Sequence, residues 1–318
     1  MELKKSVHVS PEVIWNGRKR PNTFIVGAPK CGTTALCTYL SQHPNVFVSK
    51  PKEPHYFVGD EMPGKARDFA KEERYARVFN EVEPEHRVVA EGSVWYLYSK
   101  SAILNIHKFN PDARIIVMVR RPDEMVYSMH NTAVVNFSEN ITKFDEAWQT
   151  AIAGNNRTSW SPLCDERSKL DYHRIALFSE QIERVYRFFP TKQVKVIFYD
   201  DFKDDTQASF DDVLRFLELG SHAVNLEKVN ESKVVINQSL GRLLRNPPPV
   251  VMGIARQLKH VMGAEKLGWR DRLNSMNRRV RDRKPLNPAT RSDIIHHYSE
   301  DIAKLGKMFG RDLSHWLR

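Results

Sequence analysis

Four short apolar runs, rich in β-branched residues, recur along the chain with helix-like patterns between or after them. The runs cover residues 23–28, 87–92, 113–119 and 194–199. Runs this short and this uniformly apolar are typical of parallel strands buried on both faces. Residues 179–189 and 209–219 place apolar side chains three and four positions apart, as amphipathic helices do. The pattern predicts an α/β fold with a mostly parallel sheet and helices on both faces.

A last helical pattern lies near the end of the chain, where apolar residues recur at helical spacing before Gly310, a typical helix stop. We expect one domain over residues 1–318, comprising an N-terminal extension (1–20), a basic lid-like segment (241–284) and a C-terminal packing helix (285–318). We interpret His296 and His297 as surface residues and predict no metal site, because no third ligand lies at a suitable spacing.

Composition narrows the function classes. The 318 residues are 41% hydrophobic and 28% charged, which suits a globular protein, and the formal charge of +10 favours anionic ligands. No apolar run approaches the roughly 20 residues that span a bilayer. Three cysteines form no disulfide framework, which is typical of a reducing compartment. We expect a cytoplasmic protein that engages neither a membrane nor nucleic acid; its oligomeric state stays open.

The stretch "GAPKCGTT", residues 27–34, follows the first predicted strand and opens a helical pattern. Backbone N–H groups in such a loop converge on one point and carry the positive end of the helix dipole, so a phosphate or sulfate would bind there. The lysine of nucleotide triphosphatases is missing after Gly32, and Lys30 stands two residues before that glycine. Arg120, not an acidic residue, ends the third run, so the usual magnesium ligand is absent from that position. A donor with less charge than a triphosphate fits this loop.

The loop resembles the 5'-phosphosulfate loop of sulfotransferases that use 3'-phosphoadenosine 5'-phosphosulfate (PAPS). Arg120, Pro122 and Ser128 are similar to that family's 3'-phosphate site, an Arg-x-Pro followed by a serine. The resemblance implies the sulfotransferase fold, PAPS as co-substrate, PAP as product and no metal. It also implies a set of nucleotide-binding residues: Pro29, Lys30, Cys31, Gly32, Thr33, Thr34, Arg120, Ser128, Tyr199, Arg281, Arg283 and Lys284.

A second shared segment, "KEPHYF" at residues 52–57, resembles the region of the carbohydrate and bacterial branch that carries the general base. The resemblance implies that Glu53 takes the acceptor's proton with His55 beside it, while Lys30 stabilises the leaving phosphate. His130 is a rival base. Ala35 follows the two threonines where the cytosolic phenol-type branch has a tryptophan, which favours the carbohydrate and bacterial branch.

The acceptor side is less defined. Glu91, Trp95 and Tyr96 follow the second predicted strand and are candidates for acceptor binding, although the aromatic residues suit a core equally well. Gly92 stands where related enzymes often have a lysine, which favours a different acceptor, and a small secondary metabolite is our first expectation. A saccharide, and transfer to an amine instead of a hydroxyl, both stay open.

Two functions from other classes remain. A small-molecule kinase would need ATP and Mg²⁺, against which the loop and the 3'-phosphate segment argue. A non-catalytic polyanion binder would show steep salt dependence and no turnover.

Overall fold

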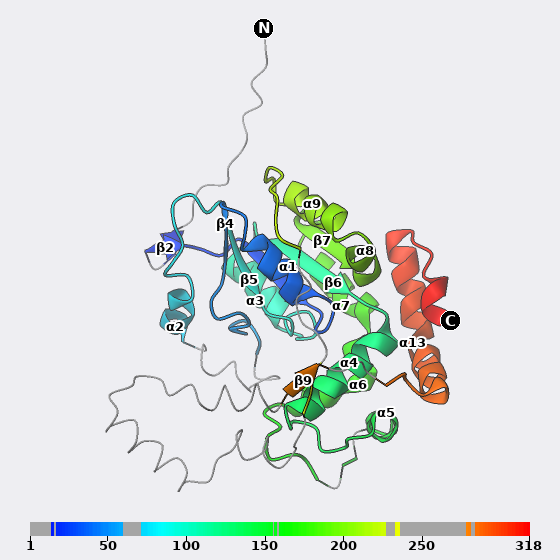
Figure 1. Cartoon of the computed structure of the whole chain (residues 1–318). Helices are drawn as coiled ribbons and strands as arrows, with labels where there is room; N and C mark the ends of the chain where they lie inside the picture. The colour runs from blue at the N-terminus through cyan, green and yellow to red at the C-terminus, as the bar shows by residue number, and fades with distance from the viewer. Residues whose placement is uncertain are drawn as a thin grey trace, which may run out of the picture. The chain divides into compact units, whose positions relative to one another are not determined.

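The four runs predicted as strands form one parallel sheet in the computed structural model of the chain (Figure 1). They are β3 (Thr23–Gly27), β5 (Val88–Gly92), β6 (Arg114–Val119) and β7 (Val194–Phe198). A three-residue strand, β4 (Val46–Val48), pairs in parallel with β5 and was not predicted. The order β4-β5-β3-β6-β7 puts β3 at the centre. The prediction of a mostly parallel sheet is confirmed.

Helices cover both faces of this sheet. Connections between parallel strands are right-handed, so α1 (Thr33–Leu40), which leads from β3 to β4, lies on one face. The helices α3 (Ala102–Phe109) and α7 (Phe178–Tyr186) connect strands in the opposite direction and lie on the other face. Because β3 and β6 send their connections to opposite faces, the loops after them are where α/β sheets bind ligands.

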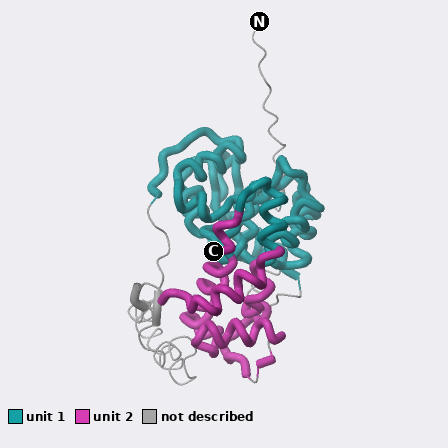
Figure 2. Tube along the Cα trace, turned by 90° about the vertical axis from the view of Figure 1, so that its right-hand side faces the viewer, with its two compact units in different colours: residues 1–121, 177–227, 301–312 teal, residues 122–176, 228–300, 313–318 magenta. Residues whose placement is uncertain are grey.

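The structure describes residues 14–15, 17–59, 71–154, 156–157, 159–226, 233–235, 278–280 and 284–318. The chain divides into two compact units, both discontinuous in sequence (Figure 2). Unit 1 comprises residues 1–121, 177–227 and 301–312, and it holds the parallel sheet. Unit 2 comprises residues 122–176, 228–300 and 313–318. One domain over residues 1–318 stays a prediction.

The remaining elements of unit 1 are short. They are β1 (Ile14–Trp15), β2 (Arg18–Lys19), α2 (Glu72–Arg77), η3 (Thr191–Gln193), α8 (Tyr199–Asp204) and α9 (Thr206–Phe216). Strands β1 and β2 pair antiparallel. The ring of Tyr39 on α1 lies 6.2 Å from that of Phe202 on α8 and 6.3 Å from that of Phe210 on α9. These ring contacts place α8 and α9 on the same face as α1.

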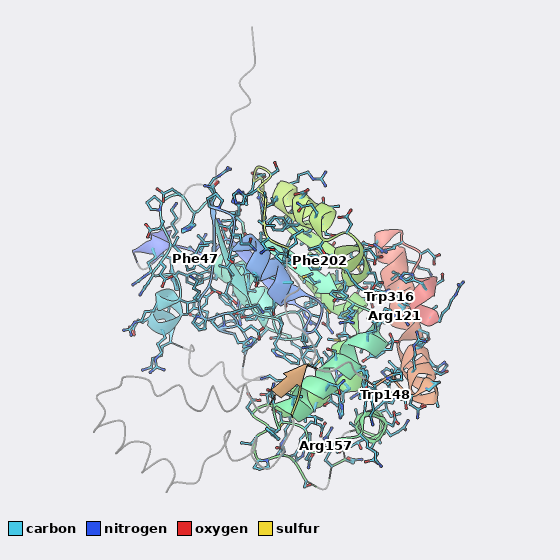
Figure 3. All side chains as sticks on the ribbon, in the orientation of Figure 1. Phe47, Arg121, Trp148, Arg157, Phe202 and Trp316 are labelled. Atoms are coloured by element: carbon cyan, nitrogen blue, oxygen red, sulfur yellow. The ribbon has the colours of Figure 1, made fainter. Side chains whose placement is uncertain are left out.

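Unit 2 is mainly helical. Its described elements are α4 (Pro122–Val135), α5 (Phe144–Ile152), η2 (Arg167–Leu170), α6 (Tyr172–Ile175), β8 (Lys233–Val235), β9 (Arg278–Val280) and η4 (Ser314–Leu317). Strands β8 and β9 pair antiparallel. Figure 3 marks Phe47 and Phe202 in unit 1 and Trp148 and Trp316 in unit 2, all of them buried.

The predicted C-terminal helix is α13 (Pro288–Phe309), and Gly310 follows it with the left-handed φ of 58° that a helix stop requires. Its apolar stripe is buried, whereas His296 and His297 are exposed, as predicted. Among the described residues, no helix has both the length and the apolar character to cross a bilayer, and no group of three metal-binding side chains gathers.

Candidate active site

The loop between β3 and α1 has the geometry of an anion cradle. Lys30 and Gly32 adopt left-handed backbone angles, with φ of 63° and 92°, and Gly32 is the N-cap of α1. A side chain at Gly32 would meet the Tyr199 ring, because a Cβ there would lie 3.1 Å from two of its carbons. Only glycine combines this backbone angle with this close approach. The start of α1 therefore presents backbone N–H groups at the carboxyl edge of the sheet.

Two further strand ends meet this loop. The guanidinium of Arg120, directly after β6, donates from Nη1 to the carbonyl oxygen of Lys30 at 3.2 Å. The guanidinium carbon of Arg120 lies 4.5 Å from the centroid of the Tyr199 ring, and Tyr199 follows β7. Lys30, Arg120 and Tyr199, which are far apart in sequence, thus come together at the carboxyl ends of β3, β6 and β7.

Cys31 lies inside the loop with its side chain buried. Burial raises the pKa of the Cys31 thiol to about 12, against the lowering effects of Arg120 and Lys30. The residue is therefore a neutral thiol, and its small side chain fills space beneath the loop while its backbone belongs to the cradle.

The segment with the predicted base lies at the end of β5, the neighbour of β3. The backbone N–H of Glu53 donates to the carbonyl oxygen of Gly92, the last residue of β5, at 3.1 Å. Glu53 and His55 both have left-handed backbone angles, with φ of 65° and 53°. Such angles are unusual outside glycine, so the surrounding contacts must hold the segment in this conformation.

The carboxylate of Glu53 lies between two cationic or titratable partners. Lys52 Nζ is 2.6 Å from Oε1, and His55 Nε2 is 3.4 Å from Oε2. Burial raises the pKa of Glu53, but hydrogen bonding to His55 and the charge of Lys52 outweigh it and bring the pKa to about 2. The carboxylate is ionised at neutral pH, and each of its oxygens keeps a lone pair for a third partner.

Glu91 has a different environment from Glu53 although both are near the end of β5. Its side chain is fully buried, and it accepts hydrogen bonds from the hydroxyls of Ser93 (2.5 Å), Tyr96 (2.8 Å) and Tyr75 (3.0 Å). Burial raises the pKa of Glu91 to about 7, against the lowering effect of these three donors. The structure thus places Glu91 and Tyr96 in the interior.

Trp95, the remaining candidate for acceptor binding, is 9% exposed and packs edge-on against Tyr98. Gly92, where related enzymes often have a lysine, is crowded from two sides. A Cβ at this position would lie 2.8 Å from Cys37 Sγ and 3.6 Å from Lys52 Cε. Lys52 therefore passes directly over the glycine on its way to Glu53.

Ser128 and His130, two of the predicted site residues, lie on α4 in unit 2. Helix α4 begins at Pro122, as expected for a proline in a first turn, and Asp123 pairs with Arg291 of α13 at 3.0 Å. Ser128 is 1% exposed, and its hydroxyl has no hydrogen-bond partner among the described residues. A buried hydroxyl without a partner is rare and suits a residue that binds a ligand.

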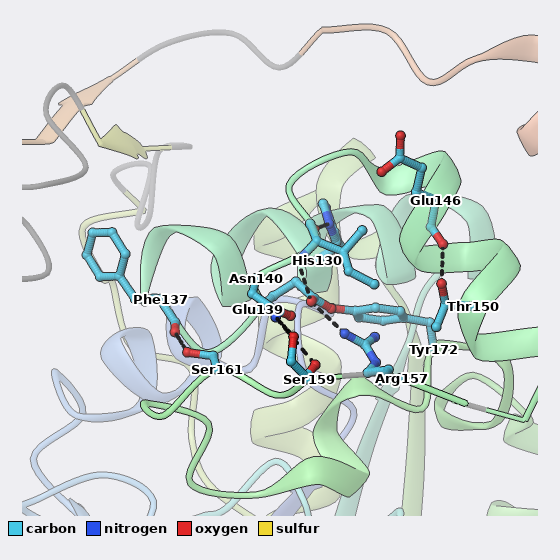
Figure 4. Close-up of polar contacts among 11 residues, drawn as sticks. His130, Phe137, Glu139, Asn140, Glu146, Thr150, Arg157, Ser159, Ser161 and Tyr172 are labelled. Carbon is cyan, nitrogen blue, oxygen red and sulfur yellow. Dashed lines mark hydrogen bonds and ion pairs between the residues drawn. The ribbon is translucent and has the colours of Figure 1, made fainter.

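His130 is occupied by structural contacts (Figure 4). Its Nε2 lies 2.8 Å from the carbonyl oxygen of Ile141, which can only accept, so this nitrogen carries the hydrogen. The ring packs against Phe144 and Tyr172, at centroid distances of 5.2 and 5.8 Å. Burial lowers the pKa of His130. These contacts make it a neutral residue that ties α4 to the loop after it.

Of the predicted basic residues, only Lys284 is described. Its carbonyl oxygen accepts a hydrogen bond of 2.9 Å from the hydroxyl of Tyr127, the neighbour of Ser128 on α4. Strand β8 also contacts α4, and β9 pairs with β8. Arg281 and Arg283 lie outside the described residues. Of the basic segment, Lys284 therefore contacts the helix that carries Ser128 directly, and β9 is linked to it through β8.

Comparison with known proteins identifies the family. The sequence pattern of the sulfotransferase domain matches residues 20–237, more than half of the chain. The chain belongs to the sulfotransferase domain family. The sulfotransferase from Alicyclobacillus acidocaldarius superposes with a TM-score of 0.66 at 24% identity, over 94% of this chain and 99% of that one. The predicted fold class and family are thereby confirmed.

Curated sulfotransferases match over a smaller share of the chain. Human heparan sulfate glucosamine 3-O-sulfotransferase 5 is 25% identical over 199 residues, which cover 63% of this chain and 54% of that protein. Human carbohydrate sulfotransferase 15 is 24% identical over 254 residues, covering 63% of this chain and 44% of that protein. This sulfotransferase domain therefore matches only about half of the length of these relatives.

Two features of the sulfotransferase site escaped sequence reasoning. Tyr75 reaches Glu91 from α2, and no local pattern marks it as a partner of that carboxylate. In the sequence Lys52 is only one position of the "KEPHYF" segment, yet together with His55 it keeps Glu53 ionised. A lysine and a glutamate adjacent in sequence ordinarily point apart, and the left-handed angle at Glu53 brings them together.

Proposed function

We propose that this sulfotransferase domain moves a sulfuryl group from PAPS to an acceptor hydroxyl, with Glu53 as the base. One observation carries the proposal: the phosphate cradle after β3 and the ionised Glu53 at the end of β5 lie at the carboxyl edge of adjacent strands. A donor phosphate and a proton acceptor at one edge are the two groups that transfer from PAPS requires.

Donor binding is assigned to one set of residues for each phosphate of the nucleotide. The N–H groups of residues 31–34 and the Lys30 ammonium would hold the 5'-phosphosulfate. Arg120 and the buried hydroxyl of Ser128, eight residues apart in sequence, would hold the 3'-phosphate. Lys284 runs beside α4 and adds positive charge. Tyr199, held at Gly32 and Arg120, would contact the adenine.

In the reaction, the acceptor oxygen forms a bond to sulfur in line with the bond to the 5'-phosphate, which breaks. The electron pair stays on the phosphate, whose charge Lys30 stabilises, and the hydroxyl proton passes to Glu53. A carboxylate with a pKa of about 2 is a weak base toward a free alcohol. It suffices here because the hydroxyl becomes strongly acidic only as the bond to sulfur forms, late in the transfer.

Glu53 is assigned as the base in preference to His130 on the strength of their contacts. The Nε2 atom of His130 is engaged with a backbone carbonyl and its ring is 1% exposed. The Glu53 side chain is 34% exposed, and it retains acceptor capacity on both oxygens. His55 and Lys52 hold the carboxylate in place, so its orientation is fixed before the acceptor arrives.

The acceptor is proposed to be a hydroxyl compound, with saccharides first to be tested. The named relatives act on heparan sulfate glucosamine and on carbohydrates. A side chain at position 92 would lie only 2.8 Å from Cys37 Sγ, so the ammonium group beside the base is that of Lys52. A small metabolite acceptor remains the second class in the test.

The test is transfer of label from ³⁵S-PAPS to a panel of saccharides and small hydroxyl metabolites, with EDTA present. We expect a labelled product from wild type and a loss of about 10²–10⁴ in rate for Glu53→Gln, with PAP affinity unchanged. His130→Gln serves as the matched comparison and should retain transfer. Equal loss in both variants, or transfer unaffected by Glu53→Gln, would remove Glu53 as the base.

A further inference from the structure

The backbone conformation of the base segment depends on two hydroxyl groups. The N–H of His55 donates to Ser93 Oγ at 3.0 Å, and the N–H of Phe57 donates to the hydroxyl of Tyr96 at 3.3 Å. Both hydroxyls in turn donate to Glu91. A chain of hydrogen bonds therefore leads from the buried Glu91 carboxylate to the segment that presents Glu53.

The direction of these hydrogen bonds follows from the charge of Glu91. An ionised carboxylate can only accept, so the hydroxyl hydrogens of Ser93 and Tyr96 must point at it. Each hydroxyl oxygen then turns lone pairs toward a backbone N–H, and every partner is satisfied. The third donor, Tyr75, completes the set from α2; its ring packs against Tyr56 and Phe57, at centroid distances of 4.2 and 5.5 Å, while its hydroxyl donates to Glu91 alone of these groups.

Protonation of Glu91 disturbs this arrangement. A carboxylic acid donates one hydrogen, so one of the three hydroxyls must accept from it and turn its own hydrogen elsewhere. Tyr75 and Tyr96 are fully buried, as is Ser93, so a displaced hydrogen finds no water. A hydroxyl that reorients in this way competes with the N–H of His55 or Phe57 and loosens the left-handed turns at Glu53 and His55.

We propose that Glu91 is a positioning residue for transfer: its carboxylate, acting through Ser93 and Tyr96, fixes residues 53–57, and transfer becomes efficient as Glu91 loses its proton. This inference rests on the proposed role of Glu53. The titratable or charged groups facing Glu91 are Lys52 from the base segment, Tyr75 from α2, Tyr96 from the loop after β5 and Cys37 from α1. Of these, Lys52 is the only charged group at neutral pH.

Burial sets the pH range in which Glu91 loses its proton, because it raises the pKa of Glu91 to about 7. Glu53, with a pKa of about 2, is ionised throughout that range and contributes no change there. A rise in kcat with a midpoint near pH 7 would therefore report Glu91. The expected rise is about tenfold, the order of effect that a small misplacement of a catalytic group produces.

The kinetic test measures kcat from pH 5.5 to 8.5 with saturating PAPS and acceptor. Glu91→Gln, which keeps the shape but always donates, should show the low-pH kcat at every pH, while PAP affinity stays within about twofold. Tyr75→Phe removes a donor to Glu91 but keeps the ring that packs against Tyr56 and Phe57. Its kcat should reach the wild-type plateau with the midpoint raised by about one pH unit, since one lost hydrogen bond weakens the ionised form.

A second readout does not require transfer. In the full chain without donor or acceptor, ¹³C NMR should show a glutamate carboxyl titrating near pH 7 that is missing from Glu91→Gln. Amide hydrogen exchange of His55 and Phe57, corrected for intrinsic rates, should slow as pH passes that midpoint. If these changes occur but no label is ever transferred, the effect of Glu91 on residues 53–57 is supported and the proposed function fails.

Other results would overturn the positioning role of Glu91 itself. One is a wild-type kcat that does not change across pH 7, and another is a Glu91 carboxyl that titrates near its ordinary value. A third is amide hydrogen exchange of His55 and Phe57 that, corrected for intrinsic rates, does not depend on pH. Should Glu91→Gln fail to fold, Tyr75→Phe alone tests the proposal. If the pH midpoint of kcat does not shift in Tyr75→Phe, the positioning role of Glu91 is contradicted.

Discussion

The buried ion pair between Glu139 and Arg157 in unit 2 allows a stability prediction with an internal control. Their side chains are 0% and 1% exposed, and the charged atoms are 2.6 Å apart. Glu139 also accepts from the hydroxyl of Tyr172 at 3.0 Å and from the N–H of Ile141 at 2.9 Å (Figure 4). Glu139→Gln leaves the guanidinium buried without its carboxylate, which destabilises by about 3–5 kcal/mol.

An exposed ion pair in the same unit is the control. Lys143 and Glu146 are 2.9 Å apart but 76% and 60% exposed, so Glu146→Gln should change stability far less than Glu139→Gln. At about 2–4 °C per kcal/mol for a protein of this size class, the buried change should lower the melting temperature by roughly 6–20 °C. The exposed change should shift it by no more than about 4 °C.

The assay is differential scanning calorimetry, with tryptophan fluorescence as a local probe. Trp160 has its ring centroid 4.9 Å from the Arg157 guanidinium carbon, so its share of the emission from the six tryptophans responds to the pair. Replacing both partners by apolar residues, Glu139→Met with Arg157→Leu, should recover most of the loss because no buried charge remains. If Glu139→Gln and Glu146→Gln have the same melting temperature, the Glu139–Arg157 pair does not stabilise the protein and the reasoning is refuted.

Four further predictions address the site. Lys30→Ala should lower kcat by about 10²–10³ with the melting temperature unchanged, measured by label transfer and calorimetry. Ser128→Ala should weaken PAP about tenfold and leave 5'-AMP binding unaltered, because only PAP carries the 3'-phosphate; equal losses for both nucleotides would contradict that role. Gly32→Ala should destabilise by about 1–3 kcal/mol in urea unfolding, since its φ is 92° and the Tyr199 ring is in the way. Because folding raises the pKa of Glu91 from an ordinary 4.5 to about 7, the folded state holds its proton longer, and the free energy of unfolding should fall by about 3 kcal/mol between those pH values; Glu91→Gln should remove that slope.

Local pattern was enough to predict the sheet. Each of the four runs is short and apolar, so burial on both faces was evident from sequence, and the observed strands agree within one residue at each end. The ends differ where chemistry changes: Ala28 belongs to the loop, and Tyr199 already starts α8. Strand β4 was missed because three residues carry no measurable period.

Side-chain partnerships between distant elements were beyond sequence reasoning. Asp301 of α13 accepts from the backbone N–H groups of Phe178 and Ser179, capping α7 from more than a hundred residues away. Glu91 illustrates the same limit, since its role is decided by Tyr75 on α2. Neither contact leaves a local signal, because the partners meet only when the sheet has formed.

Calorimetric titration with PAP and with ATP, both in EDTA, tests the central claim most directly. A cradle formed by Lys30 and the N–H groups of residues 31–34, with Arg120 and Ser128 for a second phosphate, should bind PAP at least about tenfold more tightly than ATP and need no divalent ion. Equal or tighter binding of ATP, or PAP binding that appears only when Mg²⁺ is added, would contradict it.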